Sequence, residues 1–250
     1  MTRIIAIANH KGGVGKTTST ASIGACLASK GYKTLLVDLD GQANLTTYFL
    51  LDEDEERASI YDALVNNVPL PVFPVSHNLD LVPSSLEMAG AEVSMTNIVA
   101  REQLLTGALK VVKEKYDYIL LDCPPSLGIV TTNAFLAATE IIVPMTPELL
   151  PLKGMSMLDS FIDSLRRVKP ELRINGVFIT RYNNRKLNKA VESALKQRYE
   201  NITYQTKIRE NIAVAESAGS GASIFEYDKE SNGAKDYQAL TEEIIKKSIR

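Results

Sequence analysis

The residue types best suited to chemistry gather in one glycine-rich segment near the start of the chain, NHKGGVGKTT at residues 9–18. An apolar run, Ile4–Ala8, precedes this segment and a longer amphipathic stretch follows it, so the segment should join a strand to a helix. Glycines let successive backbone N–H groups turn toward phosphate oxygens, and the helix N-terminus adds the positive end of its dipole. The segment therefore predicts a loop that binds the phosphates of a nucleotide.

Two side chains of this loop have the chemistry that phosphates and magnesium require. Lys16 would contact the β- and γ-phosphates, and the Thr17 hydroxyl would bind Mg²⁺. The strict pattern G-x-x-x-x-G-K-[ST] is not met, because His10 stands where it needs glycine, and a second lysine, Lys11, opens the loop. The nucleotide-binding residues expected in the loop are Lys11, Gly12, Gly13, Val14, Gly15, Lys16, Thr17 and Thr18.

Two aspartates follow apolar runs further along the chain. Asp40 comes shortly after the run Thr34–Val37, and Asp122 directly follows the run Tyr118–Leu121. Ligands bind at the carboxyl ends of the strands in open α/β sheets, so both carboxylates should lie near the phosphate loop. An apolar strand that ends in aspartate is typical of a Walker B element, whose carboxylate holds Mg²⁺ through water.

The lysine that opens the loop makes it similar to the motif K-G-G-x-G-K-[ST] of the deviant Walker group of P-loop ATPases, which contains ParA, MinD and the nitrogenase iron protein. Residues 38–44 (DLDGQAN) resemble the ParA-type segment D-x-D-P-Q-G-N, with Gly41 in place of proline and Ala43 in place of glycine. Residues 124–128 (PPSLG) resemble the second switch loop of ParA proteins. The resemblance covers nearly the whole chain and is to a ParA/Soj-type partition ATPase of the ParA/MinD superfamily.

This resemblance implies roles for the residues that carry it. The catalytic set would be Asp40, Lys11 and Lys16: Asp40 would position the attacking water, and Lys11 would reach across a dimer interface to the partner subunit's nucleotide. Thr17, Asp40 and Asp122 would form the magnesium site. The implied cofactors are ATP and Mg²⁺, and the implied reaction is a slow, partner-stimulated hydrolysis of ATP to ADP and phosphate.

Three more positions follow from the resemblance, each with a plainer alternative. Glu148 would contact the nucleotide across the dimer, unless it is a solvated acid in a loop. Arg181 or Tyr182 would stack on the adenine, unless the two residues belong to a basic surface loop. These three residues complete the expected nucleotide-binding set.

Apolar runs alternate with longer amphipathic stretches along the rest of the chain. Buried strands that alternate with helices predict an α/β fold, with a mostly parallel, twisted sheet and helices on both faces. A chain of 250 residues without an evident linker favours a single P-loop NTPase domain over residues 1–250, in which the proline-rich residues 69–74 form an irregular connection. The expected strands are Ile4–Ala8, Thr34–Val37, Leu79–Val82, Tyr118–Leu121, Ile141–Pro144 and Val177–Thr180, and the expected helices are Lys16–Lys30, Arg101–Lys115, Leu152–Val168, Leu187–Tyr199 and Gly233–Ile249.

The composition argues against several other classes of protein. No apolar run approaches the ~20 residues of a membrane helix, and the chain does not open with a signal peptide, so we expect a cytoplasmic protein. The two cysteines, Cys26 and Cys123, lack the spacing of metal ligands and are expected to be reduced thiols in the core.

Charge is unevenly distributed along the chain. Residues 1–150 contain 10 Lys and Arg against 17 Asp and Glu, whereas residues 151–250 contain 18 against 13. A basic half suits nucleic acid or an anionic membrane, although solvated helix faces would give the same excess. The candidate contacts to DNA phosphates are Arg185, Lys186, Lys189, Lys196, Arg198, Lys207, Arg209, Lys229, Lys235, Lys246 and Lys247.

Together these features favour an ATP-dependent switch for DNA partition, associated with the nucleoid. An ATP-bound homodimer would bind DNA non-specifically, and a ParB-like centromere-binding partner would trigger hydrolysis and release. The alternative is a MinD-like or cargo-positioning ATPase that acts on a membrane or a protein assembly. We expect no membrane binding, because the apolar residues of 240–250 suit packing on the sheet. An iron–sulfur protein would need cysteines that bridge a dimer, and a metabolic kinase would leave Lys11 without a role.

Overall fold

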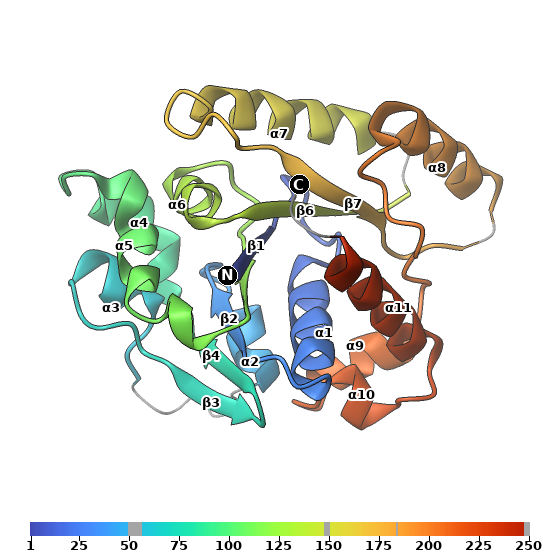
Figure 1. Cartoon of the computed structure of the whole chain (residues 1–250), viewed down its shortest axis with the longest axis horizontal. Coiled ribbons are helices and arrows are strands. Elements are labelled where there is room, and N and C mark those ends of the chain that lie inside the picture. The colour runs from blue at the N-terminus through green and yellow to red at the C-terminus, as the bar shows by residue number, and fades with distance from the viewer. Residues whose placement is uncertain (50–56, 148–150, 184, 248–250) are drawn as a thin grey trace.

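One sheet organises the structure. The computed structural model describes residues 1–49, 57–147, 151–183 and 185–247. Within these ranges seven strands form the sheet in the order β3-β4-β2-β5-β1-β6-β7 (Figure 1). All neighbouring strands are parallel except β3 and β4, which are antiparallel at one edge. The strands are β1 Arg3–Ile7, β2 Thr34–Asp38, β3 Phe73–Ser76, β4 Leu79–Val82, β5 Tyr118–Asp122, β6 Glu140–Met145 and β7 Ile174–Ile179.

The central strands are apolar along their length because both faces of the sheet are covered. In β1, Ile4 and Ala6 belong to one hydrophobic core, and Ile5 and Ile7 belong to the other. This alternation follows from the period of two in a strand, which sends successive side chains to opposite faces. Burial on both faces therefore explains why the sequence shows continuous apolar runs rather than an alternation of apolar and polar residues.

Helices cover the two faces unequally. One core lies under α3, α5, α6, α7 and α8, and the other under α1, α2 and α11, with α9 packed at its border (Figure 1). Across the described ranges, every helix is too short or too polar to span a lipid bilayer. The α-helices are α1 Lys16–Ser29, α2 Asn44–Phe49, α3 Ile60–Val65, α4 Ala91–Ser94, α5 Leu104–Lys110, α6 Ile129–Ala137, α7 Pro151–Leu165, α8 Lys186–Tyr199, α9 Ile212–Gly219, α10 Ile224–Tyr227 and α11 Asn232–Lys246, and the 3₁₀ helices are η1 Leu86–Gly90, η2 Arg101–Gln103 and η3 Lys113–Lys115.

The strand order brings three loops together at one edge of the sheet. β5 lies between β1 and β2, with Asp122 paired in register to Ile7 on one side and to Asp38 on the other. The loops that follow β1, β2 and β5 therefore leave the sheet side by side. Parallel strands place such loops at their shared carboxyl edge, where open α/β sheets bind ligands.

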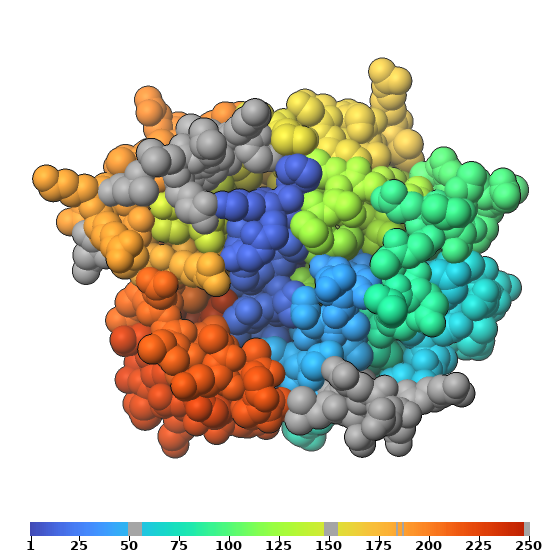
Figure 2. Space-filling model, turned by 180° about the vertical axis from the view of Figure 1, so that it is seen from behind, coloured from blue at the N-terminus to red at the C-terminus, as the bar shows by residue number. Residues whose placement is uncertain are grey.

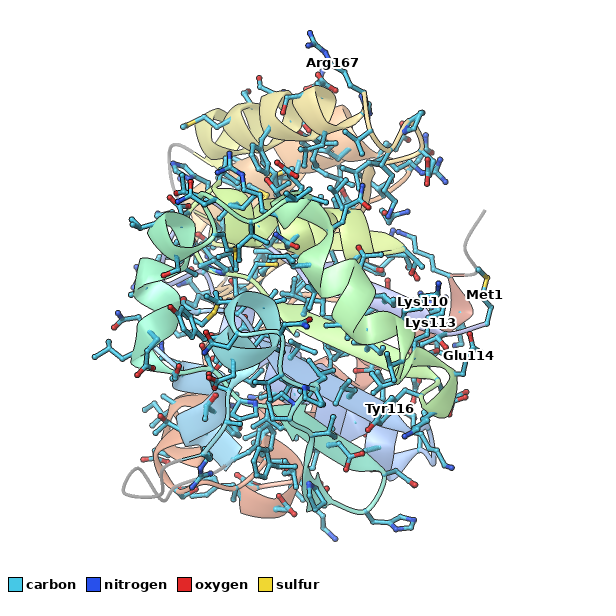
Figure 3. The ribbon with its side chains drawn as sticks, turned by 90° about the vertical axis from the view of Figure 1, so that its left-hand side faces the viewer. Met1, Lys110, Lys113, Glu114, Tyr116 and Arg167 are labelled. Carbon is cyan, nitrogen blue, oxygen red and sulfur yellow. The ribbon has the colours of Figure 1, made fainter. Side chains whose placement is uncertain are left out.

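The opposite, amino edge of the sheet has a different character. There the chain start meets the segment between α5 and β5: the Thr2 hydroxyl donates to the Lys113 carbonyl oxygen at 2.9 Å, and the Arg3 amide donates to Asp117. Met1, Lys113 and Tyr116 mark this edge in Figure 3. The Tyr116 hydroxyl donates to Asp80 of β4 at 2.6 Å, so this edge is closed by structural contacts.

The structure corrects the prediction that residues 69–74 form only an irregular connection. Phe73 and Pro74 begin strand β3, which pairs with β4 and shifts register between Pro74 and Ser76. Proline has no N–H to donate, so it is tolerated in an edge strand beside a bulge but not in a central strand. Of the three prolines that suggested a loop, only Pro74 lies in β3, where a short edge strand tolerates it.

The second correction concerns residues 101–115, which were expected to form one helix. They form η2, α5 and η3 in succession. The Asn133 side chain of α6 accepts from the Leu105 amide at 3.0 Å and donates to the Arg101 carbonyl oxygen at 2.7 Å. These bonds take up backbone groups at the junction of η2 and α5 that a continuous helix would pair internally. Within α5, Gly107 weakens the helix further.

Candidate nucleotide-binding site

Two glycines allow the loop between β1 and α1 to adopt its backbone conformation. Gly13 and Gly15 have φ values of 71° and 84°, in the left-handed region that side chains disfavour. Gly15 directly precedes the first residue of α1. The first N–H groups of a helix have no partner inside it, so the loop and the start of α1 present donors to the same space.

Side chains from neighbouring elements fix this loop in place. The Asn9 side chain donates to the Pro144 carbonyl oxygen of β6 at 2.7 Å and accepts from the Lys11 amide at 3.0 Å. The Thr180 hydroxyl, just after β7, donates to the Val14 carbonyl oxygen at 2.8 Å. The loop is therefore held by the sheet itself, which pre-organises its N–H groups for an anion.

The two lysines of the loop have different surroundings. Lys16 is 7% exposed, and its Nζ donates to the Lys11 carbonyl oxygen at 3.3 Å. Burial lowers the pKa of Lys16, while the carboxylates of Asp122 and Asp40 act to raise it. The Lys11 side chain is exposed. Lys16 thus lies inside the loop, and Lys11 lies on its outer side.

Asp122 provides a buried carboxylate at the end of β5. It is fully buried, and its Oδ2 has no hydrogen-bond partner among the described residues. Desolvation raises its pKa well above the ordinary value, the charge of Asp38 raises it further, and a hydrogen bond from Thr17 opposes the rise. A buried carboxylate oxygen left without a partner is costly unless a cation or water satisfies it.

These groups fit a magnesium ion shared with a nucleotide. Mg²⁺ prefers oxygen ligands and usually combines one or two carboxylates with waters and substrate phosphates. The Thr17 hydroxyl and the unsatisfied oxygen of Asp122 are oxygen donors of that kind. In the part of the chain that the structure describes, no group of three or more His, Cys, Asp or Glu could hold a metal. Phosphate oxygens and water would have to complete the coordination.

The two aspartates after β2 have separate positions. Asp38 is fully buried, and desolvation raises its pKa to about 6 against the opposing hydrogen bonds from Thr46. Asp40 is half-buried and lines the cavity described below, where its Oδ1 accepts from the Gln42 amide at 3.0 Å. Of the two carboxylates, it is therefore Asp40 that faces the space where a nucleotide would bind.

The departures at residues 41 and 43 have a steric explanation. A Cβ at Gly41 would lie 2.6 Å from the Ala89 amide nitrogen, so only glycine fits against this backbone. Ala43 has a φ of 49°, in the left-handed region where the ParA-type segment has glycine. A non-glycine residue in this conformation costs about 1–2 kcal/mol. The loop thus has a left-handed residue at Ala43, and its earlier part, at Gly41, packs against η1.

A cavity of about 840 Å³ lies over the phosphate loop. A volume of this size is in the range of small-molecule sites. The space-filling view shows the blue N-terminal segment between the orange and red C-terminal segments and the green central ones (Figure 2). The cavity is lined by Gly12, Gly13, Gly15, Lys16, Thr17, Thr18 and Asp40, and also by Asn44, Thr47, Tyr48, Pro125, Thr180, Arg181, Ile208, Arg209, Glu210, Asn211, Ile212, Val214, Ala215, Ala218, Gly219 and Tyr237.

The structure places the two expected base contacts, Arg181 and Tyr182, in different surroundings. Arg181 lines the cavity with φ at 49°, but Tyr182 is not among the lining residues. The Tyr182 ring lies under Lys207, with Nζ 4.6 Å from its centroid, and its hydroxyl donates to Glu192. Tyr182 therefore packs against α8, and Glu148 lies outside the described residues.

Much of the cavity wall was not predicted from the sequence. Residues 208–212 and the start of α9 line the cavity because the chain returns to the sheet edge after α8, with Tyr182 bridged to Arg209 in a parallel β-bridge. From the sequence, Arg209 was considered only as a candidate DNA contact, and nothing marked residues 208–212 as part of a nucleotide site. The contact depends on the tertiary path of the chain rather than on a local motif.

The candidate DNA contacts fall into three groups. One is Lys229, Lys246 and Lys247, of which the first two are exposed and the third donates to the Ile202 carbonyl oxygen. Five carry an ion pair: Lys196 and Lys207 with Glu192, Arg198 with Asp159, Arg209 with Asp236, and Lys235 with Glu230. Arg185, Lys186 and Lys189, at the start of α8, are exposed and make no ion pair with any side chain that the structure describes. The start of α8 thus carries three exposed basic residues close together in the sequence.

Comparisons with known proteins agree with this geometry. A family model described as an AAA domain matches residues 2–174. The sporulation initiation inhibitor protein Soj of Bacillus subtilis is 37% identical over 98% of each chain. The chromosome partitioning protein ParA of Myxococcus xanthus is 36% identical over 98% of this chain and 88% of its own length.

Solved structures show the same arrangement. A putative plasmid partition protein of Borrelia burgdorferi, bound to AMPPNP, matches with a TM-score of 0.86 at 31% identity, over 99% of this chain and 100% of that one. A cobyrinic acid a,c-diamide synthase of Mycobacterium smegmatis, with bound ADP and magnesium, matches with a TM-score of 0.85 at 31% identity, over 98% and 95%. Both similarities span the sheet, the phosphate loop and the C-terminal helices.

Proposed function

This chain belongs to the ParA-type partition ATPases of the ParA/MinD superfamily, and we propose that it is an ATP-dependent switch that moves or positions DNA. ATP and Mg²⁺ would occupy the cavity over the phosphate loop. The ATP-bound chain would form a homodimer that binds DNA without sequence preference. Hydrolysis, stimulated by a ParB-like partner, would release the DNA in the cytoplasm at the nucleoid.

The chain's own residues suit this chemistry. The loop N–H groups and Lys16 would bind and neutralise the β- and γ-phosphates, and Thr17, Asp40 and Asp122 would form the magnesium site. When bound, Mg²⁺ neutralises charge on the phosphate oxygens. Asp40, the half-buried carboxylate that lines the cavity, would orient the attacking water. Arg181 would lie against the base, because it lines the cavity.

The contrast between the two loop lysines is the observation that carries the proposal. Lys16 is 7% exposed and occupies the inside of the loop, so one chain already supplies a lysine to its own phosphates. The Lys11 side chain is exposed on the outer side. It is suited to the nucleotide of a second copy that approaches this face. Glu148, which lies outside the described residues, would contact the nucleotide across the dimer.

DNA binding would be gated by this dimerisation. Non-specific binding needs lysines and arginines that face phosphates, and its affinity falls steeply with salt. Arg185, Lys186 and Lys189 supply three exposed positive charges on one subunit. Joining two subunits doubles the number of contacts and raises the overall affinity by avidity. A monomer would therefore bind weakly and a dimer tightly.

The alternative, a MinD-like action on a membrane or a protein assembly, shares the fold. A MinD structure from Pyrococcus furiosus matches with a TM-score of 0.82 at 28% identity. Within the described residues, the apolar side chains Tyr237, Leu240 and Ile244 of α11 are buried in the core beneath it. This burial favours the DNA reading, because those side chains are not available to enter a lipid surface.

The proposal predicts an ATP-dependent dimer whose assembly needs Lys11. The Asp40→Ala protein should be a dimer with ATP and a monomer with ADP, as measured by light scattering after gel filtration, because ATP is bound but not consumed. The double variant Asp40→Ala with Lys11→Ala should bind ATP with an affinity within about threefold and remain a monomer. A normal ATP dimer of the double variant would contradict the role of Lys11, and ATP binding without any dimer in either protein would contradict the switch.

A further inference from the structure

The loop after β2 begins and ends on one buried carboxylate. Oδ1 of Asp38 accepts from the Asp40 amide at 3.1 Å, and Oδ2 accepts from both the amide and the hydroxyl of Thr46, at 2.9 and 2.8 Å. Asp38 is the last residue of β2, and Thr46 lies in the first turn of α2. The segment that carries Asp40 is therefore closed into a ring, with Asp38 at its base.

The Thr46 hydroxyl makes a second bond from the same ring. It accepts from the Ser84 amide at 2.8 Å, in the segment that follows β4. A threonine hydroxyl has one donor and two acceptor sites, so it can give its proton to Asp38 while it receives the Ser84 N–H. This single oxygen joins the end of β2, the start of α2 and the segment after β4.

The orientation of Asp40 depends on this closed ring. Asp40 Oδ1 accepts from the Gln42 amide, which fixes the carboxylate relative to the loop backbone. On the opposite side, Gly41 packs so closely against the Ala89 backbone that no Cβ fits between them. Thr46 holds one end of the loop and Ala89 bounds its middle. The position of the Asp40 carboxylate is thus set by contacts that lie outside the cavity.

We propose that Thr46 is a positioning residue for hydrolysis: its hydroxyl, between Asp38 and the Ser84 amide, keeps the loop closed so that Asp40 faces the nucleotide. Thr46 does not line the cavity, so its effect is exerted through the loop. The inference rests on the proposed function for the step that Asp40 serves. The closure itself is a property of the nucleotide-free chain and can be tested without ATP.

The test compares Thr46→Val, which keeps the shape but loses both hydroxyl bonds, with Thr46→Ser, which keeps the hydroxyl. Thr34→Val is the matched control, because Thr34 is fully buried at the other end of β2 and, among the residues that the structure describes, its hydroxyl donates only to the nearby Tyr32 carbonyl oxygen at 3.1 Å. Hydrogen exchange of the Asp40 and Thr46 amides is measured in the nucleotide-free proteins. ATP turnover with Mg²⁺ then gives kcat and KM.

Loss of the hydroxyl should open the loop without emptying the phosphate site. In Thr46→Val the two amides should exchange at least about tenfold faster than in the unchanged protein, because the hydroxyl bonds that help to hold the loop against Asp38 and Ser84 are lost. A misplaced catalytic group can cost up to about a hundredfold in rate, so kcat should fall by about tenfold to a hundredfold while KM stays within about threefold. Thr46→Ser and Thr34→Val should stay within about threefold in both measurements.

The outcomes separate the inference from the proposed function. Unchanged exchange and unchanged kcat in Thr46→Val would overturn the role of Thr46. An equal loss of kcat in Thr34→Val would also overturn it, since general destabilisation would then explain the effect. An unchanged protein that hydrolyses no ATP would contradict the proposed function, and the exchange rates would still decide the closure. Should Thr46→Val not fold, Thr46→Ala carries the same expectations.

Discussion

The phosphate site and the start of α8 show two ways in which this chain uses charge. At the phosphate site, Lys16, Asp38 and Asp122 are buried, and the hydrogen bonds of Lys16 and Asp38 place each of them in one position. At α8, Lys186 and Lys189 are exposed on the surface. A buried charge is costly unless its partners are in place, whereas an exposed charge costs little and acts through its sum with others. We therefore expect single substitutions to be severe at the first region and graded at the second.

The largest effect should come from Lys16→Ala. The substitution removes an ammonium that is already desolvated inside the loop, and a hydrogen bond to a charged group contributes about 1.5–3 kcal/mol. With two phosphates contacted, ATP affinity should fall by at least about a hundredfold. Titration with a fluorescent ATP analogue measures this change. ATP affinity within about threefold of the unchanged protein would contradict the assignment of the loop.

A smaller effect is expected for Lys186→Ala combined with Lys189→Ala. Each phosphate contact contributes about 0.9 to the slope of log affinity against log salt concentration, so losing two contacts in each subunit should lower that slope by up to about four. ATP-dependent dimerisation should not change. The affinity of the ATP-bound Asp40→Ala protein for a random duplex, measured at several salt concentrations, gives the slope.

The ion-paired residues of the same helix provide the control, with the smallest expected effect. Lys196 is 2.8 Å from Glu192, and Arg198 is 3.3 Å from Asp159, so their charges are already partly compensated. Lys196→Ala with Arg198→Ala should lower the salt slope by less than half as much as the Lys186 and Lys189 pair. An equal or larger change would show that the surface is not divided as the ion pairs suggest.

A feature could be predicted from the sequence where a local pattern also determines the position of the residues in the fold. The places of Asp40 and Asp122 were predictable because each follows an apolar strand whose end must lie at the ligand edge of the sheet, and that of Lys16 because a glycine-rich loop joins such a strand to a helix. The β1, β2 and β5 strands were predictable for the same reason, since burial on both faces leaves an unbroken apolar run. In these cases local pattern and tertiary position carry the same information.

Elsewhere the position of a residue depends on the tertiary path of the chain, which no local sequence pattern indicates. Residues 208–212 reach the cavity only because the chain returns after α8, and Tyr182 turns away from it toward Lys207 and Glu192. The closure of the β2 loop by Thr46 requires the segment after β4 to pass beside it, although 38 residues separate Thr46 from Ser84. The edge strand β3 was hidden by the proline-rich residues around it and by Pro74, which only an edge position tolerates.

The central claim is that ATP gates the binding of DNA, and one measurement tests it most directly. The Asp40→Ala protein is titrated with a random DNA duplex in the presence of ATP, of ADP and of no nucleotide, at low and at moderate salt. We expect tight, salt-sensitive binding with ATP alone. Equal binding in all three states, or no binding in any of them, would contradict it, and the second result would favour a membrane or a protein assembly as the cargo.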